Sequence, residues 1–66
     1  MYKTITATYT DKVALTNVAD ELMNLDIPRE NFFVDEEMSQ VKVMMPKYAE
    51  PEITNVLKRH HPTEVN

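Results

Sequence analysis

The chain contains no cysteine and no glycine, and each absence excludes a class of function. Without cysteine there is no disulfide, no thiolate ligand for zinc and no cysteine nucleophile. Without glycine the chain cannot form the phosphate-binding loops of Walker-type or dinucleotide-binding proteins, because those loops need backbone conformations that only glycine adopts at low cost. The sequence therefore predicts no nucleotide site of either type.

Positive charge and long apolar runs are also scarce. Seven Lys and Arg residues stand against 11 Asp and Glu, and the resulting formal net charge of -4 repels the phosphate backbone of nucleic acids. No apolar run approaches the roughly 20 residues of a membrane-spanning helix, and residues 1–4 lead into polar alternation rather than the apolar segment of a signal peptide. We expect a cytoplasmic protein that binds neither nucleic acid nor membrane.

The length of 66 residues predicts one domain, residues 1–66, with a thin core. A hydrophobic content of 42% is sufficient for folding. In a chain this short, however, the gain from burying apolar surface barely offsets the loss of chain entropy. Because no disulfide contributes, association with a second copy is the simplest further source of stability.

The first half of the chain predicts a strand followed by a helix. Residues 2–9 alternate in polarity and are rich in threonine and tyrosine, which is typical of a strand. Thr10 is the expected N-cap of the helix, with Asp11 placing negative charge near the positive end of its dipole. Apolar residues then recur at helical spacing up to Leu25, and Pro28 marks the end of the segment.

The second half predicts two strands, a helix and a short last strand. Residues 32–34 and 41–45 form the strands of a hairpin whose connection contains the acidic residues 35–37. The second helix starts within residues 48–51, where Pro51 suits a first turn, and ends in the basic residues 58–61. Residues 63–66 form the last strand.

This order of elements is the α+β, ferredoxin-like βαββαβ sandwich, also called the alpha-beta plait. Right-handed crossovers place both helices on one face of an antiparallel sheet with the strand order 4-1-3-2. The other face of the sheet then stays open. By alternation this predicted interaction face carries Thr4, Thr6, Thr8, Phe33, Lys42 and Met44.

Residues 5–11, 27–34 and 53–65 resemble the small bacterial heat-induced, general-stress-protein domain. In that family a strand ending in Tyr-Asp leads to an alanine-rich helix, and the second helix ends in a Leu-x-x-His segment, here residues 57–60. The resemblance spans nearly the whole chain and implies a ferredoxin-like fold in the cytoplasm. It implies no reaction, since none is assigned to the family. Members often place glycine after the first helix and near the end of the second, and this chain has none.

Three other groups of residues contain side chains that could form a chemical site. His60 and His61 point about 100° apart on a helix, so a cation at the helix end is favoured over a metal site. Residues 35–37 lack the alternating ligands and the glycine of a calcium loop, which favours a solvated turn. Ser39 has no histidine nearby in sequence, which favours a role in the turn. We predict no catalytic, cofactor-binding or metal site.

The open face remains the sharper prediction. An uncovered sheet that presents Phe33 and Met44 favours contact with protein. Lys42 is expected to be a solvated cation beside Met44. The alternative is that the register of the strand is shifted by one residue, so that Phe32 faces outward and Phe33 faces the core.

The sequence thus predicts a non-enzymatic protein-interaction or regulatory module that forms a homodimer through its open sheet face. The alternative is a regulatory domain that binds a small molecule. The chain is loosely similar to ACT domains in architecture, although the glycine-bearing turn after the first strand that lines the ACT ligand site is absent here.

Overall fold

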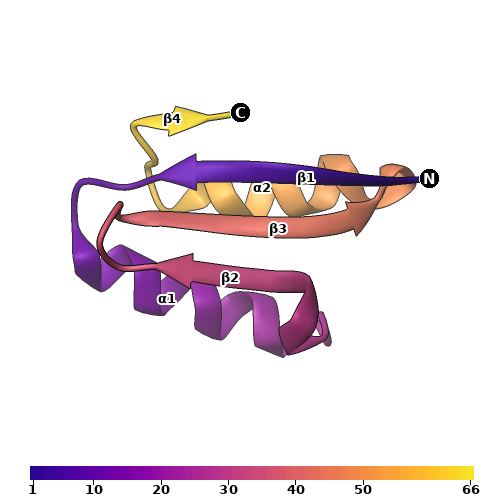
Figure 1. Cartoon of the computed structure of the whole chain (residues 1–66), viewed down its shortest axis with the longest axis horizontal. Helices are drawn as coiled ribbons and strands as arrows, with labels where there is room; N and C mark the ends of the chain where they lie inside the picture. Colours follow the sequence, from indigo (N-terminus) through magenta and orange to yellow (C-terminus); the bar gives the residue numbers. More distant parts are fainter.

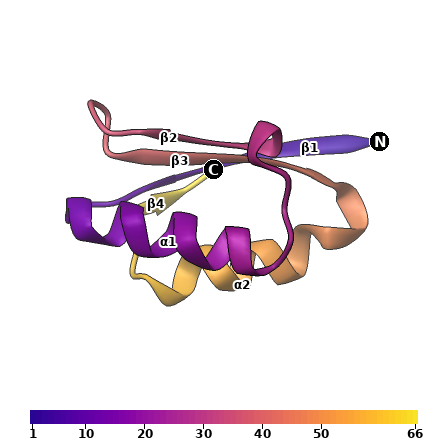
Figure 2. The same cartoon turned by 90° about the horizontal axis from the view of Figure 1, so that it is seen from below.

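In the computed structural model, which describes residues 1–66, two helices cover one face of a four-stranded antiparallel sheet (Figure 1). Seen from below, both helices lie on the same side of the strands (Figure 2). The strand order β2-β3-β1-β4 is the predicted 4-1-3-2, and the α+β ferredoxin-like fold is confirmed. The elements are β1 (Tyr2–Thr8), α1 (Lys12–Asn24), β2 (Phe32–Asp35), β3 (Gln40–Pro46), α2 (Glu50–Arg59) and β4 (Glu64–Val65), with short 3-10 turns η1 (Arg29–Asn31) before β2 and η2 (Lys47–Ala49) before α2.

The two central strands, β1 and β3, divide their side chains between the core and the open face. They pair antiparallel with Ile5 opposite Val43 and Ala7 opposite Val41, and these four side chains are buried. Because side chains alternate along a strand, the residues between them point away from the helices. The period-two pattern of the sequence therefore fixes which face of the sheet is covered.

Helix α1 begins one residue later than the sequence analysis predicted. Asp11, not Thr10, is the N-cap, and its carboxylate accepts a hydrogen bond of 2.9 Å from the backbone N–H of Val13. The backbone of Asp11 is extended, with φ −98° and ψ 124°. This geometry lets the side chain of an N-cap residue accept a hydrogen bond from an N–H group in the first turn of the helix. From there α1 buries Leu15, Val18 and Leu22 against the sheet.

Helix α2 follows the predicted pattern closely. It starts at Glu50 with Pro51 in its first turn, where the missing N–H of proline costs no hydrogen bond. The side chains of Ile53, Val56 and Leu57 are buried, and Lys58 and Arg59 lie in the last turn. The helix thus contributes three of the 12 buried residues of the core, none of which is charged.

Tyr9 joins the end of β1 to the end of α2. Its side chain is only 2% exposed, and its hydroxyl donates a 2.7 Å hydrogen bond to the backbone carbonyl of Leu57. Carbonyls in the last turn of a helix lack their usual helical partners, and this one otherwise accepts only a long, 3.4 Å hydrogen bond from the N–H of His60, so the phenol provides its shorter bond. Burial raises the pKa of Tyr9 to about 12, because it disfavours the charged phenolate.

Three residues adopt the left-handed conformation in which glycine is usual. Asp26 has φ 63° just after α1, His61 has φ 58° just after α2, and Ser39 has φ 57° at the end of the β-hairpin turn. Helices commonly end with a glycine in this conformation. Both helices are therefore followed by a non-glycine residue, Asp26 or His61, whose side chain adds some steric strain to this backbone conformation. These are the two places where the resembled family often has glycine.

Candidate functional site

The open face of the sheet holds all six residues of the predicted interaction face. The cross-strand pairs place Thr4 opposite Met44, Thr6 opposite Lys42, and Phe33 opposite Lys42, so the residues form one continuous patch over β1, β3 and β2. Figure 1 looks onto this face, and both helices lie behind it. No element of the chain covers the patch.

Large apolar side chains are solvent-exposed on this face. Phe33 is 60% exposed and Met44 is 41% exposed. Phe32, by contrast, is partly buried against the core, so the alternative register with Phe32 outward is wrong. Tyr2, 61% exposed and opposite Pro46 at the start of β1, extends the face and was not part of the prediction.

A shallow hollow of about 220 Å³ lies at the β2 end of the open face. Side chains from η1, β1, β2 and β3 surround it: Thr4, Glu30, Asn31, Phe32, Phe33, Lys42 and Met44. Pockets that enclose small molecules are usually about 300–1,000 Å³. The hollow is therefore smaller than a typical metabolite site and is better described as a shallow depression in the open face.

Lys42 is the charged side chain at the centre of the face. The ion pairs of the structure join Lys3 to Glu50, and Arg59 and His60 to Glu21, so Lys42 has no intramolecular ion-pair partner. Its neighbours across the strands are Thr6 and Phe33, which carry no charge. The Lys42 ammonium is therefore free to pair with a carboxylate from outside the chain.

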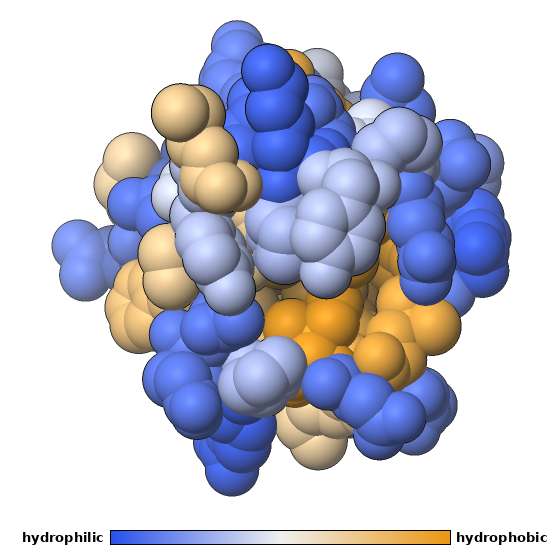
Figure 3. Space-filling model, turned by 90° about the vertical axis from the view of Figure 1, so that its right-hand side faces the viewer, coloured by the Kyte–Doolittle hydropathy of each residue, from blue (hydrophilic) through white to orange (hydrophobic).

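A second group of apolar residues is exposed at the end of the molecule where β1 begins. Figure 3 looks at this end and shows apolar residues (orange) in contact with one another, with hydrophilic residues (blue) along most of their border. Leu25, the C-cap of α1, lies at this end and is exposed. This group lies at the end of the molecule where α1 ends (Figure 1, Figure 3).

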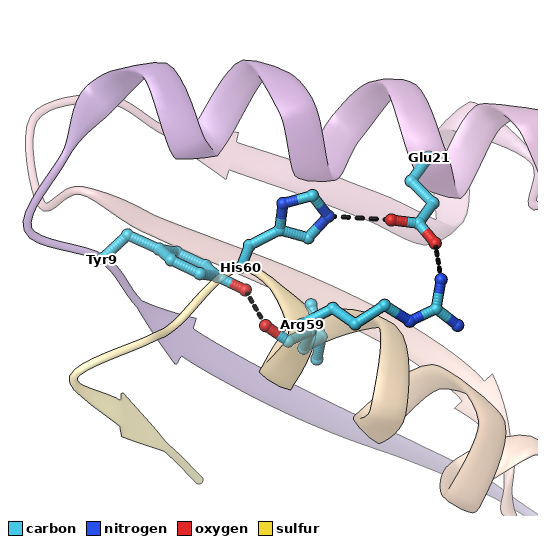
Figure 4. Close-up of polar contacts among 5 residues, drawn as sticks. Tyr9, Glu21, Arg59 and His60 are labelled. Atoms are coloured by element: carbon cyan, nitrogen blue, oxygen red, sulfur yellow. Dashed lines mark hydrogen bonds and ion pairs between the residues drawn. The ribbon is translucent and has the colours of Figure 1, made fainter.

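His60 belongs to a contact between the two helices. Its Nε2 lies 2.8 Å from Oε1 of Glu21, and Nη1 of Arg59 lies 2.6 Å from Oε2 of the same carboxylate (Figure 4). His61 turns away with its positive φ and is exposed. No group of three or more His, Asp or Glu side chains is arranged to hold a metal ion. The two histidines therefore do not share one site, and His60 helps Glu21 to fasten α2 to α1.

The acidic hairpin and Ser39 form turn structure. The carboxylate of Asp35 accepts a 3.0 Å hydrogen bond from the N–H of Met38, and the ammonium of Lys12 donates to the backbone carbonyl of Glu36. The hydroxyl of Ser39 donates a 2.5 Å hydrogen bond to the carbonyl of Tyr9. These contacts use the polar groups to close the hairpin and to attach it to β1.

Comparison with known proteins identified no relative of this chain. No protein-family model, curated protein or solved structure matches the chain significantly. The resemblance to the stress-protein domain stays a prediction. Among the helices, none combines the length and the apolar character that crossing a membrane requires.

Proposed function

We propose that the chain is a non-catalytic cytoplasmic interaction module whose open sheet face binds the same face of a second copy. The observation that carries this proposal is the exposure of Met44 on the central strand β3 and Phe33 on the edge strand β2, on a sheet face that no element covers. Domains are built from layers that bury their apolar faces against one another. A second copy supplies the missing layer.

The size of the chain supports an interface that uses the whole face. A stable interface buries about 800 Å² on each partner. The isolated chain exposes 4461 Å², so such an interface would cover nearly a fifth of its surface. The open face is the side of the sheet that the two helices leave free (Figure 2), which makes it the natural choice for a twofold-symmetric contact.

Charge constrains how two copies meet. In a twofold contact each Lys42 must avoid its own counterpart, since two desolvated ammonium groups repel each other. Carboxylates at the rim of the same face, Glu30 beside the hollow and Asp35 at the end of β2, are available counter-charges. A twofold axis displaced from Lys42 places each ammonium near an acidic residue of the second copy.

Replacement of Met44 by aspartate is expected to convert the dimer to a monomer. The new carboxylate would have to leave water at the centre of the interface, which should weaken the dimer at least about 100-fold. Light scattering at high micromolar concentration should show the mass of a dimer for the parent protein and of a monomer for Met44→Asp. The matched control is Tyr48→Asp, because Tyr48 is 87% exposed on η2, away from the face.

Two results would remove this proposal. One is a parent protein that is strictly monomeric at high micromolar concentration. The other is a dimer whose mass is unchanged by both Met44→Asp and Phe33→Asp, while circular dichroism shows that both variants are folded.

The absence of an assembled nucleophile supports a non-catalytic module. The only serine, Ser39, donates its hydroxyl hydrogen to the carbonyl of Tyr9. An activated serine instead donates to a general base. His60, the partly buried histidine, lies against Glu21 on the helical side of the molecule.

The competing function is small-molecule binding, as in ACT-like regulatory domains. The hollow beside Phe33 favours it in one respect, since Lys42 offers a free cation next to an aromatic ring. If this function holds, an anionic metabolite should raise the melting temperature. At 100 times its dissociation constant the ligand adds about 2.7 kcal/mol of stability. A thermal-shift screen of amino acids, nucleotides and metal ions tests this, and Lys42→Met should abolish any effect of an anion at the hollow.

A further inference from the structure

The outer edge of β2 is a second uncovered surface, distinct from the open face. In the sheet order β2-β3-β1-β4, β2 pairs with β3 on one side and has no strand on the other. An edge of this kind presents unpaired backbone N–H and C=O groups to any extended chain that approaches it.

The alternation of hydrogen-bonded residue pairs in the sheet identifies which backbone N–H and C=O groups of β2 point away from β3. The N–H of Tyr9 donates to the carbonyl of Ser39 at one end of the β1–β3 ladder, and the N–H of Lys47 donates to the carbonyl of Met1 at the other. Odd-numbered residues of β3 therefore bond to β1, and Lys42 bonds to Phe33 of β2. The next residue of β2, Val34, then points both its N–H and its C=O away from the sheet.

A groove lies beside this edge, between β2 and α1. It has a volume of about 220 Å³, and one face of α1 lines it with residues at the spacing i, i+3, i+4, i+7 and i+8. Leu15, Ala19 and Val34 form its apolar part, and the polar side chains around it are Lys12, Thr16, Asp20 and Glu36. The volume suits one apolar side chain of an added strand.

The charges around the groove favour a basic partner over a second copy. Glu30 precedes β2, Asp35 is its last residue, and Glu36 and Glu37 follow it, while Asp20 lies across the groove on α1. Lys12 also lines the groove and its ammonium donates to the backbone carbonyl of Glu36, so with Asp20 and Glu36 the lining keeps a net charge of one negative unit. Two copies that met at this edge would bring their acidic residues together, whereas lysine or arginine on a partner would be attracted.

We propose that the edge of β2 and this groove bind an extended, basic peptide segment of a partner protein. The segment adds antiparallel to β2 and exchanges two backbone hydrogen bonds with Val34. Its central apolar side chain enters the groove between Val34 and Ala19. Basic side chains two positions before and after it, on the same face of the added strand, lie near Asp20 and Glu36.

The test uses short peptides and amide NMR of the whole chain. The probe is acetylated and amidated Lys-Thr-Val-Thr-Lys, and the two controls are Glu-Thr-Val-Thr-Glu and the lysine peptide N-methylated at its valine. The lysine peptide should shift the amide signals of Val34 and Ala19 and slow hydrogen exchange at the Val34 N–H at least about tenfold. Both controls should bind at least about tenfold more weakly, because one has the wrong charge and the other lacks the donor to the Val34 carbonyl.

Two charge reversals separate the groove from a general charge effect. Asp20→Lys should weaken binding of the lysine peptide and strengthen binding of the glutamate peptide. Glu64→Lys makes the same change of net charge on β4, at the opposite edge of the sheet, and should leave both affinities unchanged. Equal effects of the two variants would overturn the proposal.

Other outcomes also contradict it. Signals that shift at Phe33 and Lys42 instead of Val34 would place the peptide on the open face. Exchange at Val34 that is slow without peptide and slows further as protein concentration rises would mean that a second copy occupies the edge. No shift with any peptide at millimolar concentration would leave the groove without this role. None of these results depends on dimerisation through the open face.

Discussion

Replacement of Leu57 by alanine is expected to lower the free energy of unfolding by about 2–5 kcal/mol. The side chain is fully buried in α2, within a core of 12 residues, and alanine at this position lacks its isopropyl group and leaves a cavity. A chain of this length has a total stability of roughly 3–10 kcal/mol. The variant should therefore lose a large part of its total stability, and urea denaturation followed by circular dichroism measures the loss.

The control for this variant is its neighbour. Lys58 is exposed in the same turn of α2, and Lys58→Ala should change the free energy of unfolding by less than about 0.5 kcal/mol. A loss of less than about 1 kcal/mol for Leu57→Ala would mean that the core is not packed around this residue.

The stability of the fold is expected to fall by about 2 kcal/mol between pH 10 and pH 12 because of one residue. The pKa of Tyr9 is about 12 in the folded chain and 10.0 when the phenol is free in water. A pKa that is higher in the folded state gives a contribution that is complete below pH 10 and is lost as the pH rises through 12. A shift of about two pKa units is worth about 2.7 kcal/mol in all, of which about 2 kcal/mol is lost between pH 10 and pH 12. Urea denaturation at intervals from pH 8 to pH 12 measures the effect.

Tyr9→Phe isolates this contribution. At neutral pH the free energy of unfolding of the variant should be about 1–3 kcal/mol lower than that of the parent. The carbonyl of Leu57 loses the hydrogen bond from the buried phenol and keeps only the 3.4 Å bond from the N–H of His60. Its stability should then fall less steeply above pH 10 than that of the parent. Tyr48→Phe, at an exposed position, should follow the parent curve. Parallel curves for the parent and Tyr9→Phe would show that the phenol is not the responsible group.

The fold was predictable because its elements have clear periods. Alternation in β1 and β3 gave the correct faces, and the helical stripe of α2 was complete at Ile53, Val56 and Leu57. The predicted N-cap of α1, Thr10, was wrong by one residue because Thr10 and Asp11 are both good capping residues. Only the backbone angles at Asp11 distinguish them.

The six residues of the open face were predictable for the same reason, whereas its surroundings were not. The hollow depends on the 3-10 turn η1, which places Glu30 and Asn31 beside Phe33. The helix contact of Glu21 joins it to His60 across 39 positions of sequence. Neither has a local sequence signal, since contacts between distant segments follow from the packing of whole elements.

The groove beside β2 was missed for a related reason. Its apolar residues, Leu15, Ala19 and Val34, all read as ordinary core positions in the sequence. Which of them reaches the surface depends on how far α1 lies from the edge strand. The outward hydrogen-bonding groups of Val34 likewise follow from the phase of the β1–β3 ladder, which is a property of three strands together.

The position of β1 in the sheet has a consequence for synthesis on the ribosome. β1 is a central strand, yet both of its neighbours, β3 and β4, come later in the chain. The 31 residues between Thr8 and Gln40 take about 2–6 s to translate at roughly 5–20 residues per second. Throughout that interval the alternating apolar side chains of β1 have no strand beside them. The nascent chain is thus most exposed to aggregation, and most in need of a chaperone, before β3 has emerged.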